Sequence, residues 1–137
     1  GPSYHIGTVT NGKYRYIRNL KPDEFYIEKH LMGWTGDGQL NNPYWQTWVR
    51  DAWKDSHTYD LVKRYMHRPA IQLYHTAEDP YELTNLASSS EHIWIRELLS
   101  DELDKWMISQ GDPGAPEDTT DALDAARRGQ HLFFPRP

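Results

Sequence analysis

The sequence predicts an α+β fold, and three features carry that prediction. Asn11-Gly12 lies between two runs of strand-forming residues, a pattern typical of a β-hairpin. A third run of this kind covers residues 71–75. Residues 91–110 instead repeat apolar side chains at helical spacing. We therefore expect an N-terminal hairpin, a further strand and a long helix towards the end of the chain.

The hairpin is expected at residues 5–18. Asn-Gly favours a two-residue turn, because both residues tolerate a positive φ. Such a turn pairs Val9 with Tyr14 and Gly7 with Tyr16. Val9 and the two tyrosines then share one face of the hairpin, which we expect to face the core.

A helical insert is predicted between the strands, over residues 43–67. Asn42-Pro43 has the pattern of an N-cap followed by the first helical residue. A second helix is expected from Thr58 to His67. The first helix carries one apolar stripe, which we interpret as a core face, with a sugar-stacking platform as the alternative: Trp45, Trp48, Val49, Ala52 and Trp53.

The long helix is expected to begin at a capping box formed by Ser88 and Glu91 and to stop at Gly111. Its predicted buried stripe consists of Ile95, Leu98, Leu99, Leu103, Trp106 and Met107. Residues 113–137 form a Pro/Gly-rich tail, in which we expect a short helix at 121–128.

Length and composition exclude several classes of protein. A chain of 137 residues fits one domain. The absence of cysteine excludes disulfides, thiolate nucleophiles and zinc-thiolate sites. A net charge of −5 argues against nucleic acid or an anionic membrane as the main partner. Gly1-Pro2-Ser3 fits a scar left by removal of a tag, and it equally fits a native segment.

No complete catalytic constellation can be read from the residues. The seven histidines are scattered, without the paired spacing that metal ligands on a helix need. No glycine-rich phosphate loop with its lysine is present. Trp34 differs from the other tryptophans, because it lies among glycines where no helix face requires an aromatic ring. It is a candidate for contact with a sugar or a protein partner.

Three stretches together resemble the C-terminal subdomain of formylglycine-dependent sulfatases. Residues 12–20 resemble the strand R-Y-K-Y-I-x-N-L that opens this subdomain. Residues 68–87 resemble the family signature R-P-A-E-E-L-Y-D-L-x-x-D-P-Y-E-L-x-N-L-A, and residues 98–112 resemble the terminal helix and its exit. The resemblance covers residues 4–112 and is closest to the heparan N-sulfatase (sulfamidase) branch, which is typically bacterial.

The resemblance implies a small antiparallel sheet of about four strands, with the long C-terminal helix packed across it. Members of the family hydrolyse sulfate esters or sulfamates, using calcium and a formylglycine made in a C/S-x-P-x-R motif. This sequence lacks that motif. We therefore expect no catalytic residue, metal ligand or cofactor in this chain. Calcium and formylglycine are expected in the larger N-terminal domain of a parent enzyme, and this chain alone is expected to be inactive.

In such enzymes the subdomain helps to wall the substrate pocket, and a wall for a sulfated glycan needs cations and aromatic rings. The alternative for Arg64 and Arg68 is a structural ion pair with Asp79 or Glu82. His75 stands where the family has Asp, so the hydrogen bonds of that Asp must be replaced or lost. The candidate substrate-binding residues are His5, His30, Trp34, Arg64 and His67.

The expected partners are the N-terminal sulfatase domain and a sulfated glycan, with no nucleic acid and no membrane. An exposed apolar face is expected to support a dimer, and the parent is expected to be periplasmic or secreted. Two other hypotheses stay open. One is a stand-alone carbohydrate- or protein-binding module, and the weaker one is an enzyme that uses the scattered histidines and acids.

Overall fold

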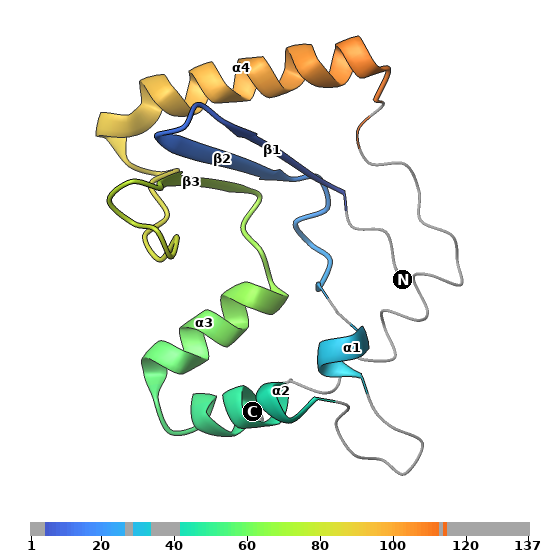
Figure 1. Cartoon of the computed structure of the whole chain (residues 1–137), viewed down its shortest axis with the longest axis vertical. Helices are drawn as coiled ribbons and strands as arrows, with labels where there is room; N and C mark the ends of the chain where they lie inside the picture. Colours follow the sequence, from blue (N-terminus) through green and yellow to red (C-terminus); the bar gives the residue numbers. More distant parts are fainter. Residues whose placement is uncertain (1–4, 27–28, 34–41, 113, 115–137) are drawn as a thin grey trace. The chain divides into compact units, whose positions relative to one another are not determined.

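The computed structural model describes residues 5–26, 29–33, 42–112 and 114 (Figure 1). These residues belong to two compact units. The sheet unit contains residues 5–21 and the described residues from 69 onwards. The helical unit contains the described residues from 22 to 68. The extent of the expected subdomain, residues 4–112, stays a prediction.

The sheet has three antiparallel strands in the order β1-β2-β3. They are β1 (Ile6–Thr10), β2 (Tyr14–Asn19) and β3 (Ile71–His75). The α+β prediction is confirmed, and β3 covers the residues at which the third strand was expected. Among the described residues the sheet has three strands, whereas about four were expected.

The pairing of the hairpin strands differs from the prediction. Val9 pairs with Tyr16 and Gly7 with Arg18, which in each case is two residues further along β2 than predicted. A shift of two residues leaves every side chain on its expected face, because strand side chains alternate with a period of two. Val9 and Tyr14 accordingly pack against the core around Tyr16.

The turn explains this shift. The backbone N–H of Asn11 donates to the carbonyl of Tyr14 at 3.2 Å, so Gly12 and Lys13 are the central turn residues. Gly12 has a φ of +86°, which favours glycine. The side chain of Asn11 accepts from the N–H groups of Lys13 and Tyr14 at 3.0 and 2.8 Å. Asn11 is therefore the first of the four turn residues, whereas the prediction placed it second.

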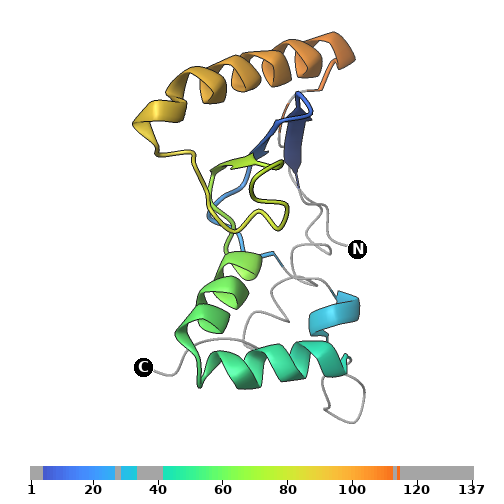
Figure 2. The same ribbon diagram turned by 60° about the vertical axis from the view of Figure 1, so that its left-hand side comes forward.

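The long helix α4 (Ile93–Gln110) lies along one face of the sheet (Figures 1 and 2). Leu98 and Trp106 were predicted in its buried stripe but are 48% and 57% exposed. The sheet covers only one i, i+4 row of the helix, and those two positions lie beside that row. The buried row, which packs on Tyr16 and Leu73, consists of Ile95, Leu99, Leu103 and Met107.

The start of α4 also differs from the predicted capping box. A 3-10 turn, η1 (Ser90–His92), precedes the helix, and Ser89 Oγ lies 2.8 Å from His92 Nδ1. Because this turn occupies the residues after Ser88, the expected bond from Ser88 to the first helical turn does not form. The end of the helix is as predicted, since Gly111 adopts the left-handed conformation at the C-cap.

The helical unit contains α1 (Lys29–Met32), α2 (Pro43–Ala52) and α3 (Ser56–Met66). Asn42 caps α2 by accepting the N–H of Tyr44 at 2.9 Å, as predicted. The helix α3 begins before the expected Thr58, because Asp55 serves as its N-cap. The core between these helices is formed by Met32, Trp45, Ala52, Val62 and Met66.

Candidate functional site

Aromatic rings from three segments of the helical unit meet in a row of edge contacts. The ring of Trp48 on α2 lies 6.4 Å from that of Tyr65 on α3. Tyr65 in turn lies 5.6 Å from Tyr26, with the two rings 79° apart. Trp45 contacts both Trp48 and Tyr65 from the core. We call Trp48, Tyr65 and Tyr26 the aromatic ladder.

A guanidinium group lies at one end of this ladder. The Cζ of Arg68 is 3.5 Å from the centroid of the Tyr26 ring and 5.7 Å from that of Tyr65. A cation over a ring face is attracted by the electron density of that face. The Tyr26 N–H donates to the carbonyl of Met66 at 2.7 Å, which fixes the position of Tyr26 at the end of α3.

Further cations lie in the last turn of α3. Lys63 and Arg64 precede its C-cap residue, His67. The partial negative charge at a helix C-terminus favours cations there. The ring of His67 also lies 5.5 Å from that of Phe25. The end of α3 therefore combines positive charge with aromatic surface, the combination that can bind an anionic sugar.

The structure brings together two of the five candidate residues, Arg64 and His67, which both lie at the end of α3. His5 belongs to the other unit, where its carbonyl accepts the N–H of Leu20 at 3.0 Å. His30 lies in α1, and its side chain is outside the described part. Trp34 and the tail from residue 115, with the helix expected at 121–128, lie outside the described residues.

The sequence reasoning missed Tyr26 and misread two tryptophans. Trp48 and Trp53 were expected in the core but are 44% and 54% exposed. The core side of α2 is narrower than the predicted stripe, and its buried residues are Trp45 and Ala52. Tyr44, four residues before Trp48, is exposed as well, so these two rings share one face of α2.

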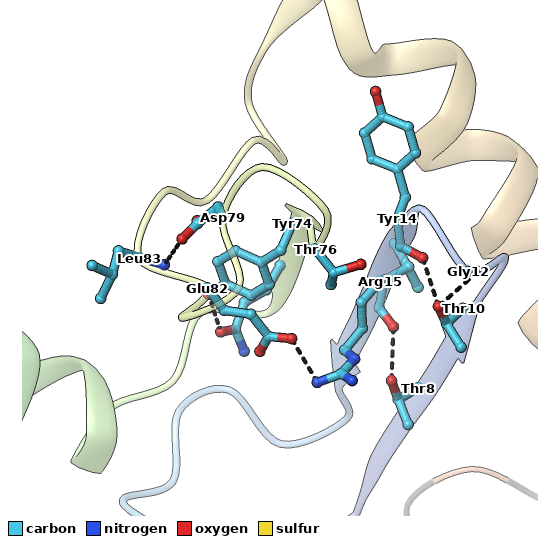
Figure 3. A network of polar contacts seen from close by, with 12 residues as sticks. Thr8, Thr10, Gly12, Tyr14, Arg15, Tyr74, Thr76, Asp79, Glu82 and Leu83 are labelled. Carbon is cyan, nitrogen blue, oxygen red and sulfur yellow. Dashed lines mark hydrogen bonds and ion pairs between the residues drawn. The ribbon is translucent and has the colours of Figure 1, made fainter.

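The residues that most resemble the sulfatase signature hold a loop in place (Figure 3). The carboxylate of Asp79 accepts the N–H groups of Leu83 and Thr84 at 3.0 and 2.8 Å. Glu82 has a φ of +54° and forms an ion pair with Arg15 at 2.5 Å. An ion pair with Asp79 or Glu82 was the alternative for Arg64 and Arg68, and the partner of Glu82 is Arg15 on β2.

His75, which stands where the sulfatase signature has Asp, makes a backbone hydrogen bond of its own. It is buried, and its Nδ1 accepts the N–H of Glu78 at 3.2 Å. Its ring also packs edge-on against Tyr14, with the centroids 4.6 Å apart. The residue at this position therefore binds the backbone through a ring nitrogen as the acceptor.

A charged pair links two elements within the sheet unit. Arg18 on β2 pairs with Asp104 on α4 and donates to Ser100 Oγ at 2.7 Å. The hydrogen bond from Arg18 lowers the pKa of Asp104, and the same bond raises the pKa of Arg18. This pair ties the helix to the sheet.

Two features are absent from the described residues. Nowhere in these ranges do three His, Cys, Asp or Glu side chains gather in a way that could hold a metal ion. Among the same residues, none of the helices has the length and apolar character needed to cross a membrane.

The chain is similar to sulfatases, as the sequence motifs predicted. An ulvan-active sulfatase of Formosa agariphila is 28% identical over 118 residues, which is 78% of this chain and 17% of that protein. The human N-sulphoglucosamine sulphohydrolase is 26% identical over 121 residues, or 81% of this chain and 21% of that protein. No protein-family model matches. The chain thus spans about a fifth of the length of these relatives.

Proposed function

We propose that this chain is the C-terminal part of a sulfatase-like hydrolase and that it supports the catalytic domain and lines the pocket for a sulfated glycan. The similarity to proteins named as sulfatases supports the enzyme class. The observation that supports a glycan-facing role is the placement of Arg68 over Tyr26, at the end of the aromatic ladder.

This arrangement suits a sulfated sugar for two physical reasons. Ring faces pack against the apolar face of a pyranose, and Trp and Tyr offer such faces with little conformational freedom to lose. A guanidinium group binds the oxygens of a sulfate with charge-assisted hydrogen bonds. The ring contact with Tyr26 fixes the position of the Arg68 guanidinium at the end of the ladder.

The proposal assigns catalysis to a different part of the parent enzyme. The chain has no cysteine and no C/S-x-P-x-R motif. Calcium and formylglycine would both belong to the catalytic domain, so the isolated chain is expected to release no sulfate from any sulfated substrate. Measurable turnover by the purified chain would overturn this part.

Tryptophan fluorescence tests the glycan-facing role, because Trp48 belongs to the ladder. We expect a heparan-type oligosaccharide to bind the chain weakly and its desulfated form to bind less. Arg68→Met keeps an apolar stem and removes the charge, so it should weaken binding by about tenfold, the loss of one charge-assisted hydrogen bond. Arg50→Met removes an equal charge from α2 and serves as the control.

Three outcomes separate the hypotheses. Sulfate-dependent binding that Arg68→Met weakens and Arg50→Met leaves unchanged supports the proposal. An equal effect of the two variants, or no binding, contradicts it. Saturable binding that is tight and independent of sulfate supports the stand-alone carbohydrate-binding module, which the exposed rings of Tyr44 and Trp48 favour.

A further inference from the structure

The outer edge of β1 has no neighbouring strand among the described residues. Along its inner edge, the carbonyl of His5 and the N–H of Asn11 bond to β2 or its turn. Because facing residues in an antiparallel pair alternate between bonded and non-bonded pairs, the peptide groups of Ile6, Thr8 and Thr10 point outwards. These three residues present a row of N–H and C=O groups, which we call the β1 edge.

The two edges of the sheet differ in the partners that their backbone groups have. On the β3 edge, the loop after the strand supplies hydrogen bonds: Leu73 donates to the Asn85 side chain at 2.9 Å and accepts from the Leu86 N–H at 2.8 Å. The β1 edge lacks the charged residues and prolines with which proteins usually protect an edge strand. It therefore has the character of an edge that pairs with another strand.

An apolar row of α4 accompanies this edge. Along the helix, Trp94 and Leu98 are four residues apart, and Leu98 and Trp106 are eight apart, so the three share one row. Their side chains are 62%, 48% and 57% exposed. We call these three side chains the α4 ridge. Glu102 occupies the remaining position of the row and pairs with Lys105 at 2.7 Å. The ridge thus adds no net charge to a contact.

The contacts of α4 with the sheet show which way the ridge faces. Leu103 lies directly over β1, so close that a Cβ built on Gly7 would be 2.9 Å from its Cδ2. Ser100 and Asp104 lie on the β2 side, where they bind Arg18. At 100° per residue, Leu98 and Trp106 fall on the opposite side of Leu103 from these two residues. The ridge therefore faces outwards beyond the β1 edge.

We propose that a second copy of this chain pairs with the β1 edge, antiparallel and about a two-fold axis. A two-fold axis at Thr8 places Thr8 opposite its own copy and Ile6 opposite Thr10, which are favourable cross-strand pairs. Two three-stranded sheets then become one sheet of six strands. This inference does not depend on the proposed function.

A second copy fits better than a partner of different chemistry. The edge carries no formal charge, so two copies meet there without repulsion although each chain carries −5 overall. The α4 helix contacts both β1 and β2, and strands are spaced by about 4.8 Å. The two helices would then lie about 10 Å apart, which is the distance at which helices pack. Each ridge would be covered by the other, as a closed two-fold contact requires.

Sedimentation velocity on the full chain tests the dimer over a range from low micromolar to millimolar concentration. Thr8→Lys places two like charges at the two-fold axis, and Leu98→Glu charges the ridge. Each should raise the dissociation constant of the dimer by at least about tenfold. Thr84→Lys and Ile108→Glu make the same changes at exposed positions away from the β1 edge, and they should leave it unchanged.

Hydrogen exchange provides a readout that does not depend on any variant. In the wild-type chain, the amides of Ile6, Thr8 and Thr10 should exchange more slowly as the concentration rises. The amides of Val9 and Asn11, which face β2, should show no such change. A chain that stays monomeric throughout, a dimer unaffected by Thr8→Lys and Leu98→Glu, or edge amides that exchange independently of concentration would each overturn the proposal.

Discussion

Asn85 accepts the backbone N–H of Leu73 at 2.9 Å and thereby fills a hydrogen-bonding position that a further strand would otherwise occupy. Its amide also donates to the carbonyl of Ile71 at 3.2 Å. One side chain thus binds two backbone groups of β3, and its Oδ1 accepts the N–H of Ala87 in addition. The asparagine of the sulfatase-like signature is therefore explained by its structural role in closing one edge of the sheet.

Asn85→Ala should destabilise the chain, because it leaves the N–H of Leu73 and the carbonyl of Ile71 without this partner. We expect a loss of about 2 kcal/mol in the free energy of unfolding, the typical cost of an unsatisfied backbone group. Urea denaturation measures this loss. Asn85→Asp keeps the acceptor and should cost less, and Thr84→Ala is the neighbouring control. A loss for Asn85→Ala no larger than that of the control would contradict the role.

Gly7 is required because Leu103 packs directly over its backbone. A Cβ at this position would approach Leu103 Cδ2 to 2.9 Å and Cδ1 to 3.2 Å. Gly7→Ala should therefore cost about 1 kcal/mol through overpacking. Leu103→Ala alone should cost about 3 kcal/mol as a cavity. In the double variant the alanine at residue 7 should cost less than in the wild type, and thermal unfolding of all four proteins forms the cycle. Strict additivity would count against the contact.

Local sequence patterns predicted most of the elements. The Asn-Gly pair indicated the hairpin and the run at 71–75 indicated β3, because strand propensity and turn chemistry act over a few residues. The same local signals did not decide between two adjacent turn positions. The Asn11 side chain binds two backbone N–H groups, and this bonding selects Gly12 as the residue with positive φ.

The candidate site could not be predicted from the periodicity of apolar residues. A helical stripe reports which residues are apolar, but it does not report how wide the covering surface is. For this reason Trp48 and Leu98 were both assigned to cores from which they protrude. The contact between Arg68 and Tyr26 joins residues 42 positions apart, and no short motif reports such a contact.

The pair formed by Arg18 and Asp104 predicts a dependence of stability on pH. The hydrogen bond from Arg18 lowers the pKa of Asp104 in the folded state. The stabilising contribution of the Asp104 carboxylate is therefore fully present above its unfolded pKa of about 3.9. It is lost as the pH falls through the folded pKa. Because the Asp104 side chain is half exposed, we expect Asp104→Asn to cost only about 0.5 kcal/mol at neutral pH.

A series of denaturation curves from pH 7 to below pH 3 tests this expectation. The difference between the wild type and Asp104→Asn should stay constant down to about pH 4 and shrink below it. In an Arg18→Met background the same substitution should have little effect at any pH. A difference that persists unchanged at the lowest pH would show that the carboxylate does not act through Arg18.

His75 supplies an acceptor where the sulfatase signature has an acid, and the role of this acceptor, Nδ1, can be tested. Nδ1 accepts the N–H of Glu78 at 3.2 Å, whereas Nε2 lies 3.7 Å from the Glu78 carboxylate. Asn at this position places an oxygen near the site of Nδ1, so His75→Asn should retain the backbone bond. Because that acceptor is buried, His75→Leu should lower the free energy of unfolding by about 1 kcal/mol more than His75→Asn. Denaturant unfolding ranks the two variants, and the reverse order would assign the role of His75 to its ring packing against Tyr14.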